Sequence, residues 1–294
     1  MNPYIVTHGG VGAKDDLKDG PERAAEEGLR LLAAGKDALE AVIAAAVLLE
    51  DDPRYNAGTG SRICIDGKTV EMDAALMTSD GRMGAVEAIR EVKNPILVAR
   101  AVMDTPHVKL AGEGATAFAR RMGFPPFDPT TPGAREFLKK GFERIRAGNV
   151  LPHNRPWLDF AKRYPVLPPE GACDTIGAVA LDAQGLFAVS NSTGGGAMKL
   201  VGRVGDSPHF GAGLWAGPAG AVATTGIGEH IIRKLVAKEA YDRLAAGATA
   251  QEAADFGVTL LPKEIPLGLV VAGRDGPGVA TNGSLPVGIR VLDR

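Results

Sequence analysis

The sequence predicts an α+β fold in which two stacked, mainly antiparallel sheets are covered by helices on their outer faces. Strand-like segments separated by turn dipeptides such as Asp66-Gly67 and Asp80-Gly81 occur along the chain. Helix-like segments with capping signals accompany them. A proline-rich segment at residues 124–172 separates two sheet-forming halves. Helices over two stacked sheets would bury both halves in one core, so we expect a single domain over residues 1–294.

The first half is expected to begin with a strand and two helices. The apolar segment 5–7 runs into His8-Gly9-Gly10, which reads as a strand entering a turn. Pro21 opens a helix at a position where a missing N–H costs nothing. A capping box of Asp37 and Glu40 begins the second helix. The remaining elements expected here are strands at 63–65, 70–77, 83–92 and 108–110 and helices at 95–104 and 113–122.

The proline-rich segment is expected to act as a linker. Residues 124–172 hold nine of the 20 prolines. A helix is compatible with residues 137–146, but the prolines between 152 and 169 prevent continuous regular structure afterwards. The elements expected beyond the linker are strands at 175–181, 186–190, 211–215, 221–225, 267–272 and 278–281 and helices at 229–244 and 250–260.

Composition and charge exclude several classes of protein. Hydrophobic residues make up 45% of the 294, which argues for a packed core rather than disorder. A net charge of −2 offers no basic face for a nucleic acid. Cys64 and Cys173 are far apart, and the five histidines show no zinc-ligand spacing. The longest apolar stretch, 41–49, is half a membrane span, and the first residues carry no signal-peptide features. We therefore expect a cytoplasmic protein with no membrane or nucleic-acid partner.

Threonines beside glycines in the second half are candidate catalytic residues. Thr175 follows the linker, Thr193 precedes two glycines, and Thr225-Gly226 joins a strand to a helix. A threonine hydroxyl is a weak nucleophile that needs a base. The α-amino group of an N-terminal threonine can be that base, because its pKa of about 8 leaves a neutral fraction at pH 7. This route requires the chain to be cut before Thr175, where the proline-rich segment ends.

Each of these motifs also has a structural interpretation. A threonine at the start of a strand is a common β-former. The turn at Thr225-Gly226-Ile227-Gly228 could hold an anion at a helix N-terminus. The stretch from Arg203 to Asp206 could be a surface turn with a solvated ion pair. A non-catalytic, anion-binding α/β protein is therefore one hypothesis, and His8 is interpreted as a structural histidine rather than a base.

Several motifs occur in order over nearly the whole chain outside the linker. They are His8-Gly9-Gly10, Asn56-Ala57-Gly58-Thr59-Gly60-Ser61, Glu71-Met72-Asp73-Ala74, Asn94-Pro95, Pro106-His107-Val108, Gly112-Glu113-Gly114-Ala115, Thr175-Ile176-Gly177-Ala178, Ser192-Thr193-Gly194-Gly195, Gly202-Arg203-Val204-Gly205-Asp206-Ser207 and Thr225-Gly226-Ile227-Gly228-Glu229. In these motifs the chain resembles the plant-type asparaginases and isoaspartyl peptidases, which are N-terminal-nucleophile hydrolases. The resemblance implies a four-layer αββα sandwich of the N-terminal-nucleophile hydrolase type.

The resemblance also implies that the chain cuts itself between Asp174 and Thr175. The products would be an α subunit of residues 1–174 and a β subunit of residues 175–294. The freed amine of Thr175 would then act as base while its hydroxyl attacks L-asparagine or a β-aspartyl dipeptide, forming an acyl-enzyme ester. Two such heterodimers would form an (αβ)₂ assembly.

Further residues receive catalytic roles from the same resemblance. Thr193 corresponds to the threonine that hydrogen-bonds the nucleophile. Thr225 and the Gly226 N–H correspond to the oxyanion hole, where preorganised donors stabilise the developing negative charge. Asn56 corresponds to a residue of the first half that positions the nucleophile.

Substrate binding and a structural ion are implied in the same way. Arg203 would hold the substrate α-carboxylate, which suits a planar guanidinium. Asp206 and the carbonyl of Gly228 would hold the α-ammonium. No cofactor is implied, but family members hold a monovalent cation, Na⁺ or K⁺, on backbone carbonyls. The corresponding carbonyls here are those of Leu49, Glu50, Asp52, Tyr55, Ala57 and Thr59.

The sequence departs from the family at one position and leaves a second enzyme class open. Gly196 stands where the family often has Met or another bulky residue, and a glycine there would loosen the loop near the substrate. Residues 174–177 also resemble the cut site of the glycosylasparaginases, a related group of amidases. Residues 56–61 and 193–195 instead follow the plant-type pattern, which favours the asparaginase hypothesis.

Overall fold

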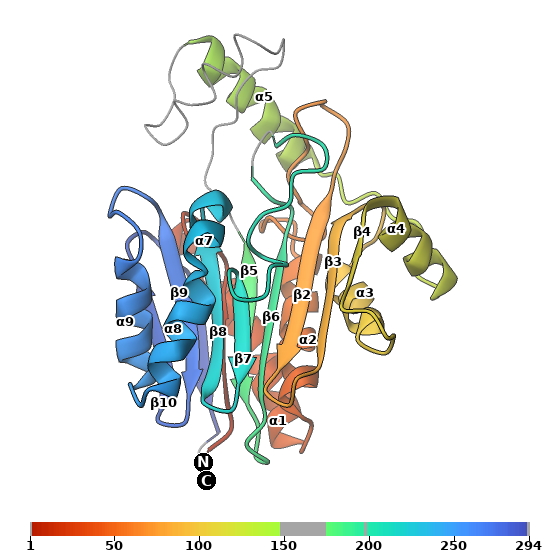
Figure 1. Cartoon of the computed structure of the whole chain (residues 1–294). Coiled ribbons are helices and arrows are strands. Elements are labelled where there is room, and N and C mark those ends of the chain that lie inside the picture. Colours follow the sequence, from red (N-terminus) through yellow and green to blue (C-terminus); the bar gives the residue numbers. More distant parts are fainter. Residues whose placement is uncertain (1, 148–174, 197–198, 293–294) are drawn as a thin grey trace.

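The computed structural model describes residues 2–147, 175–196 and 199–292. They form a seven-stranded and a four-stranded sheet with helices packed on both, which confirms the mixed α+β prediction (Figure 1). None of the described helices is long and apolar enough to cross a membrane. The helices are α1 (Asp19–Ala33), α2 (Ala38–Asp51), α3 (Pro95–Val102), α4 (Gly112–Arg121), α5 (Pro132–Arg146), α7 (Gly228–Lys234), α8 (Val236–Ala245) and α9 (Ala250–Thr259), with a 3₁₀ turn η1 (Asp15–Leu17). The strands are β1 (Tyr4–His8), β2 (Met72–Thr78), β3 (Met83–Ile89), β4 (Lys109–Ala111), β5 (Ile176–Leu181), β6 (Phe187–Thr193), β7 (Leu214–Gly217), β8 (Gly220–Gly226), β9 (Leu267–Gly273), β10 (Gly276–Thr281) and β11 (Val287–Val291).

The larger sheet combines strands from both halves of the chain. Its order is β11-β1-β5-β6-β2-β3-β4, and of its described pairs only β3–β4 is parallel. The smaller sheet has the order β10-β9-β8-β7. The two sheet-forming halves expected from the sequence therefore do not correspond to the two sheets. Turn dipeptides specify local hairpins, whereas the pairing of distant strands depends on which faces the core buries.

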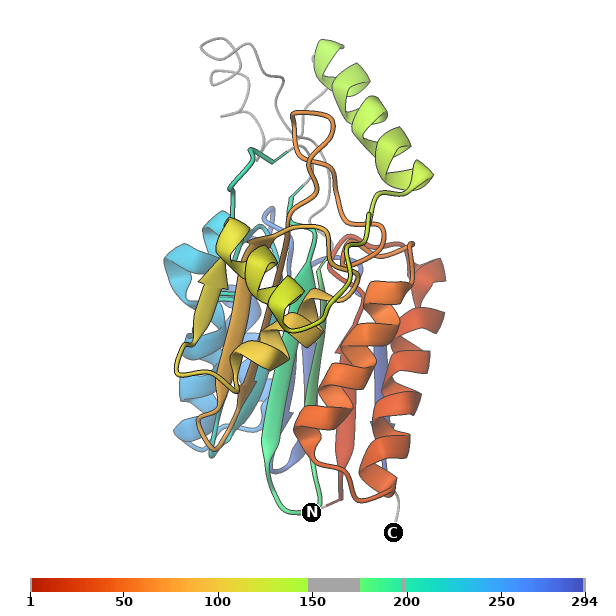
Figure 2. The same cartoon turned by 90° about the vertical axis from the view of Figure 1, so that its right-hand side faces the viewer.

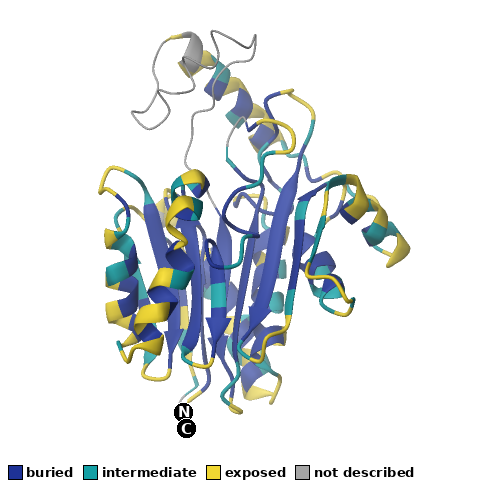
Figure 3. Ribbon diagram, viewed as in Figure 1, coloured by how far each residue is buried: buried dark blue, intermediate teal, exposed yellow. Residues whose placement is uncertain are grey.

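Three clusters of buried apolar side chains lie between these elements. One lies between the larger sheet and helices that include α1 and α2, which lie side by side in Figure 2. A second lies between the two sheets, and the third lies under α8 and α9. Neighbouring residues of a strand point to opposite faces, so Ile5 and Ala178 join the first cluster while Val6 and Val179 join the second. Strands β1 and β5 are therefore buried on both faces (Figure 3).

One expected helix is interrupted. The helix predicted over residues 229–244 is two helices, α7 and α8, which meet at Leu235. Leu235 has a φ of 48°, in the left-handed region, and is 50% exposed. Both helices contact β8. The apolar pattern continues across the break because both helices face the same sheet, so the pattern alone could not reveal it.

Two strand predictions also differ from the structure. Residues 63–65 form no strand, and Ile63 makes only an isolated bridge with Val70. Strand β11 is not among the expected strands, yet it pairs antiparallel with β1. Its Arg290 bonds Glu26 of α1 at 2.6 Å. The strand is short, and only its Gly288 is buried, which gives a weak sequence signal.

The helix in the proline-rich segment begins earlier than expected. Helix α5 starts at Pro132 rather than at residue 137, because Thr131 caps it by accepting from the Ala134 N–H at 3.1 Å. The guanidinium of Arg62 lies 3.7 Å from the ring centre of Phe137 and helps to hold α5 against the body. Residues 148–174, with most of the linker and Asp174, lie outside the described residues.

Candidate active site

Thr175 lies directly before β5, at the centre of the larger sheet. It is 3% exposed, and its Oγ1 donates to Oγ1 of Thr193 at 3.3 Å. Thr193 is the last residue of β6, and pairing of Ile176 with Ser192 places both threonines at the same end of neighbouring strands. The N–H of Gly195 donates to the same Thr193 oxygen at 2.9 Å. The Thr193 hydroxyl is thereby fixed beside the expected nucleophile.

Asn56 acts on this pair through the turn that follows Thr193. Its Nδ2 donates to the carbonyl of Gly195 at 2.7 Å, and its main-chain carbonyl accepts from Gly194 N–H at 2.8 Å. Its Oδ1 accepts from Arg62 N–H at 2.9 Å. These bonds hold the turn that presents Gly195 to Thr193. The structure therefore brings Asn56 to the site through the turn.

Arg203 forms an ion pair that the sequence did not suggest. Its Nε and Nη2 donate to the two carboxylate oxygens of Glu229, each at 2.9 Å. Such a two-point contact fixes the plane of a guanidinium. Burial acts to raise the pKa of Glu229, but its bonds to Arg203 outweigh burial and hold the pKa below its usual value. Glu229, at the start of α7, therefore orients Arg203.

Asp206 is a buried carboxyl group beside this pair. It is 4% exposed, and its Oδ2 accepts from the Thr224 hydroxyl at 3.3 Å. Burial raises the pKa of Asp206 to about 7, while Arg203 and Thr224 act to lower it. A Cβ on Gly228 would lie 2.9 Å from Asp206 Oδ1 and 3.0 Å from Arg203 Nη2. Gly228 therefore lies against both charged groups.

One small cavity is lined both by the two threonines and by Arg203 and Asp206. Its volume is about 10 Å³, which is room for about one water molecule. Asn56, Thr225 and Gly228 are not among its lining residues. Thr225 Oγ1 accepts from the Val11 N–H at 3.1 Å. The lining residues are Thr175, Thr193, Gly195, Gly196, Arg203, Gly205, Asp206, Ser207 and Gly226.

His8 is buried next to the strand that carries Thr175. It pairs with Gly177, and a Cβ on Gly177 would lie 2.4 Å from His8 Nε2. Burial lowers the pKa of His8 to about 3, and the main chain of Thr175 acts in the opposite direction. Neither ring nitrogen has a hydrogen-bond partner among the described atoms. A buried, neutral imidazole packed against a strand agrees with the structural interpretation of His8.

The loop after α2, where a cation was expected, contains two glycines that lie close to backbone carbonyls. Gly58 and Gly60 have φ values of 49° and 97°. A Cβ on Gly58 would lie 2.5 Å from the Glu50 carbonyl oxygen, and one on Gly60 would lie 2.5 Å from that of Pro53. The described side chains contain no cluster of His, Cys, Asp or Glu that could hold a metal ion.

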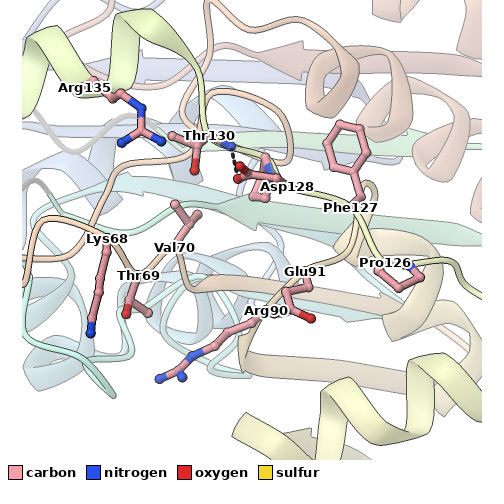
Figure 4. Close-up of a pocket in the computed structure, with 11 residues that line it drawn as sticks. Lys68, Thr69, Val70, Arg90, Glu91, Pro126, Phe127, Asp128, Thr130 and Arg135 are labelled. Carbon is pink, nitrogen blue, oxygen red and sulfur yellow. Dashed lines mark hydrogen bonds between the residues drawn. The ribbon is translucent and has the colours of Figure 1, made fainter.

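A larger groove lies apart from this cavity. It has a volume of about 670 Å³, and Lys68, Arg90 and Arg135 are among the side chains that line it (Figure 4). Asp128 at its edge accepts from the Thr130 N–H at 2.9 Å. The groove shares no lining residue with the cavity at Thr175. It is therefore not part of the candidate active site.

Two buried charged residues near the site have no role predicted from the sequence. Glu71 and Lys199 are each 2% exposed, and Lys199 Nζ donates to the Glu71 carbonyl at 2.8 Å. The signal in the sequence is the Glu71-Met72-Asp73 segment, which places two acids in a strand-like stretch that is otherwise apolar. Buried acids need partners, and those partners are distant in sequence.

Comparisons with known proteins place this chain among the amidohydrolases. A family model described as asparaginase matches residues 1–285, and the chain belongs to that family. It is 43% identical over 269 residues to the plant-type L-asparaginase of Pyrococcus furiosus, covering 88% of this chain and 85% of that protein. It is 39% identical over 301 residues to the isoaspartyl peptidase/L-asparaginase of Homo sapiens, covering 97% of this chain and 92% of that protein. The resemblance seen in the sequence motifs is confirmed.

Proposed function

We propose that this protein is an autoprocessing threonine amidohydrolase that acts on L-asparagine and β-aspartyl dipeptides. The observation that carries the proposal is the buried Thr175 hydroxyl, held by Thr193 in one cavity with Arg203 and Asp206. A nucleophile beside one cation and one carboxyl group suits a substrate that carries an α-carboxylate and an α-ammonium. The names of the two relatives, L-asparaginase and isoaspartyl peptidase, support the same substrates.

In the proposed maturation the chain cuts itself before Thr175. The Thr175 oxygen attacks the carbonyl carbon of Asp174, and the peptide C–N bond breaks as the C–O bond forms. This N-to-O shift leaves an ester and a free amine on Thr175. Water then hydrolyses the ester, which releases the carboxylate of Asp174 and restores the threonine hydroxyl.

In the proposed catalytic cycle the new amine acts as the base. It takes the proton of the Thr175 hydroxyl while the oxygen attacks the side-chain amide carbon of the substrate. The C–N bond breaks, and the protonated amine gives its proton to the departing ammonia or peptide amine. Water, activated by the same amine, hydrolyses the acyl-enzyme ester and releases aspartate.

Substrate binding and charge stabilisation are assigned to neighbouring groups. Arg203 would bind the α-carboxylate, and Asp206 with the Gly228 carbonyl would bind the α-ammonium. The Gly226 N–H and the Thr225 hydroxyl would stabilise the oxyanion, where the loss of one donor costs about 3–4 kcal/mol. Gly226 is kept free of a side chain because a Cβ would lie 2.5 Å from the Pro266 carbonyl oxygen.

The fold and assembly are proposed to follow the same family. Helices, sheet, sheet and helices, with a buried apolar cluster at each of three contacts, support a four-layer αββα sandwich of the N-terminal-nucleophile hydrolase type. Residues 1–294 would form one catalytic domain, cut into subunits of residues 1–174 and 175–294. Two processed heterodimers would associate as (αβ)₂ in the cytoplasm.

The proposed enzyme needs no cofactor for its chemistry. A Na⁺ or K⁺ ion held by the carbonyls of residues 49–59 would stiffen the loop that leads to Asn56. Because Asn56 holds the turn at Gly195, such an ion would support the site from outside it.

The proposed maturation is tested on a denaturing gel with N-terminal sequencing. The purified wild type is expected to give two fragments, one of which begins at Thr175. Thr175→Ala should give one band at 30.5 kDa, because it lacks the attacking oxygen. Thr175→Ser keeps a hydroxyl and should still be cut. A wild type that stays intact and inactive after long incubation would refute the proposal.

The substrate class is tested with the processed protein. L-asparagine, a β-aspartyl dipeptide and an N-glycosylated asparagine should be assayed side by side. The proposal expects turnover of the first two and little of the third. A preference for the glycosylated substrate would instead favour a glycosylasparaginase-like amidase, and binding of anions without turnover would favour the non-catalytic hypothesis.

A further inference from the structure

Arg203 reaches the cavity from a turn that the hydrophobic core hardly holds. Leu200 and Val201, in this turn, are 36% and 45% exposed. Gly202 has a φ of 85°, and a Cβ there would meet no atom within 4 Å. Apolar side chains stabilise a segment in proportion to the area they bury. The position of this turn therefore depends on its polar contacts.

Two polar contacts of the turn are made to Glu71. Glu71 Oε2 accepts from the Gly202 N–H at 2.6 Å. Its main-chain carbonyl accepts from Lys199 Nζ at 2.8 Å. The Lys199 carbonyl in turn accepts from the Ile65 N–H at 2.9 Å. Glu71 thus holds both the beginning and the end of the turn.

A second ion pair fixes the carboxylate of Glu71. Its Oε1 accepts from Arg90 Nε at 3.1 Å and from Nη2 at 2.6 Å. Arg90 follows β3 and lines the groove in Figure 4. Hydrogen bonds between charged groups are stronger than neutral ones. The Glu71 carboxylate is therefore held on one side by Arg90 and holds the Gly202 N–H on the other.

We propose that Glu71 is a positioning residue for substrate binding, which sets the place of Arg203 through the Gly202 N–H. The inference rests on the proposed role of Arg203. Glu71 does not touch the cavity at Thr175, so it is not expected to take part in bond making or breaking. Its loss should weaken recognition of the substrate α-carboxylate and leave the threonine chemistry largely unchanged.

Glu71→Gln tests the inference. Glutamine keeps the shape of the side chain but loses the negative charge that accepts from Arg90 and from the Gly202 N–H. The loss of a charge-assisted bond of this kind corresponds to roughly a tenfold weaker interaction. We expect KM for L-asparagine to rise about tenfold, kcat to change less than about threefold, and self-cleavage to continue. The fold is checked through the melting temperature and through the two fragments on a gel.

A double-mutant cycle with Arg203→Ala separates positioning from general damage. If Glu71 acts through Arg203, Glu71→Gln should raise KM little further in the Arg203→Ala background. Glu87→Gln is the matched control, since Glu87 bonds Lys109 at 2.7 Å and has no bond to the turn. It should leave KM unchanged. Gly202→Ala strains the left-handed turn and should raise KM as Glu71→Gln does. If the Glu71→Gln protein does not fold, Gly202→Ala takes its place in the test.

Each outcome of this set supports or overturns one of the two proposals. If Arg203→Ala raises KM while Glu71→Gln and Gly202→Ala do not, the positioning role of Glu71 is wrong and the proposed function stands. Fully additive effects, or an equal rise in KM for Glu87→Gln, would also overturn it. If Arg203→Ala leaves KM unchanged in an active enzyme, the assignment of Arg203 in the proposed function is itself wrong.

Discussion

The hydroxyl of Thr175 donates a hydrogen bond to the hydroxyl of Thr193 across two central strands, with 3.3 Å between the oxygens. This distance is longer than the usual 2.7–2.8 Å for such a bond. Thr193 in turn accepts from the Gly195 N–H, and Asn56 holds Gly195. The proposed nucleophile is therefore oriented by a neighbour whose own position depends on backbone contacts, and the long contact leaves room to tighten.

Thr193→Val tests this orientation. Valine keeps the volume of the side chain but removes the hydroxyl oxygen that accepts from Thr175. The buried Gly195 N–H loses the same acceptor. We expect kcat to fall about 10- to 100-fold and the free energy of unfolding to fall by about 1–3 kcal/mol. Thr193→Ser keeps the hydroxyl and is the matched control. Ammonia release measures kcat, and a valine variant as fast as the wild type would contradict the assignment of Thr193.

The raised pKa of Asp206 predicts a pH dependence of substrate binding. Burial raises this pKa to about 7, Arg203 and Thr224 oppose the rise, and Glu229 adds to it. Only the ionised carboxylate attracts an α-ammonium. As pH falls below about 7, Asp206 takes up a proton, so kcat/KM for L-asparagine should fall toward tenfold per pH unit.

The control for this pH dependence is Asp206→Asn. Asparagine cannot titrate, so this variant should have a low kcat/KM at every pH. It should also lose the part of the fall in kcat/KM at acid pH (the acid limb) that Asp206 causes. The Thr175 amine also titrates, with a reference pKa of about 8, and its effect should remain in both proteins. An acid limb of the same shape in both would show that Asp206 is not its cause.

The candidate site residues could be named from the sequence, but the contacts that hold them could not. Thr175, Thr193, Arg203 and Asp206 could be proposed because their motifs are local. Glu71 belongs to one of those motifs, but it received no role because its partner Gly202 is 131 positions away. No local pattern encodes such a pair, since it arises only when β2 and the turn are packed together.

The same limit applies to the fold. Turn dipeptides and capping residues predicted most helices and hairpins, including the helix capped by Asp37, whose side chain accepts from the Glu40 N–H. They did not predict that β5 pairs with β1, or that a helix breaks at Leu235. Both depend on which distant surface an element packs against, because the core outweighs local preference.

His8 predicts an acid-sensitive contribution to stability. Its pKa is about 3 in the folded protein, against 6.5 in the unfolded chain. Between these values the unfolded chain binds the extra proton, so this contribution is complete above pH 6.5 and is lost as pH falls toward 3. The loss is at most about 1.4 kcal/mol per pH unit.

Denaturant unfolding of wild-type His8 and His8→Asn, both in an uncut Thr175→Ala background, measures this contribution. The asparagine variant should be less stable at pH 7, because a smaller side chain leaves a cavity. Its free energy of unfolding should nevertheless fall less between pH 7 and pH 4. The carboxyl groups titrate in both proteins, but only the protein with His8 also loses the contribution of the histidine. Equal losses in the two proteins would show that His8 does not stay neutral in the fold.

We predict that the turn after Thr193 tolerates no side chain at Gly194, and Gly194→Ala tests this. A Cβ there would lie 2.4 Å from Asn56 Oδ1 and 2.7 Å from the Arg62 backbone nitrogen, and backbone cannot move aside easily. We expect kcat to fall at least about tenfold and stability to fall by about 1–3 kcal/mol, as for other overpacked sites. Gly114→Ala in α4, where a Cβ meets nothing within 4 Å, should instead raise stability by about 0.5–1 kcal/mol and leave kcat unchanged. Equal effects of the two substitutions on kcat would mean that the turn at Gly194 does not control the position of Thr193.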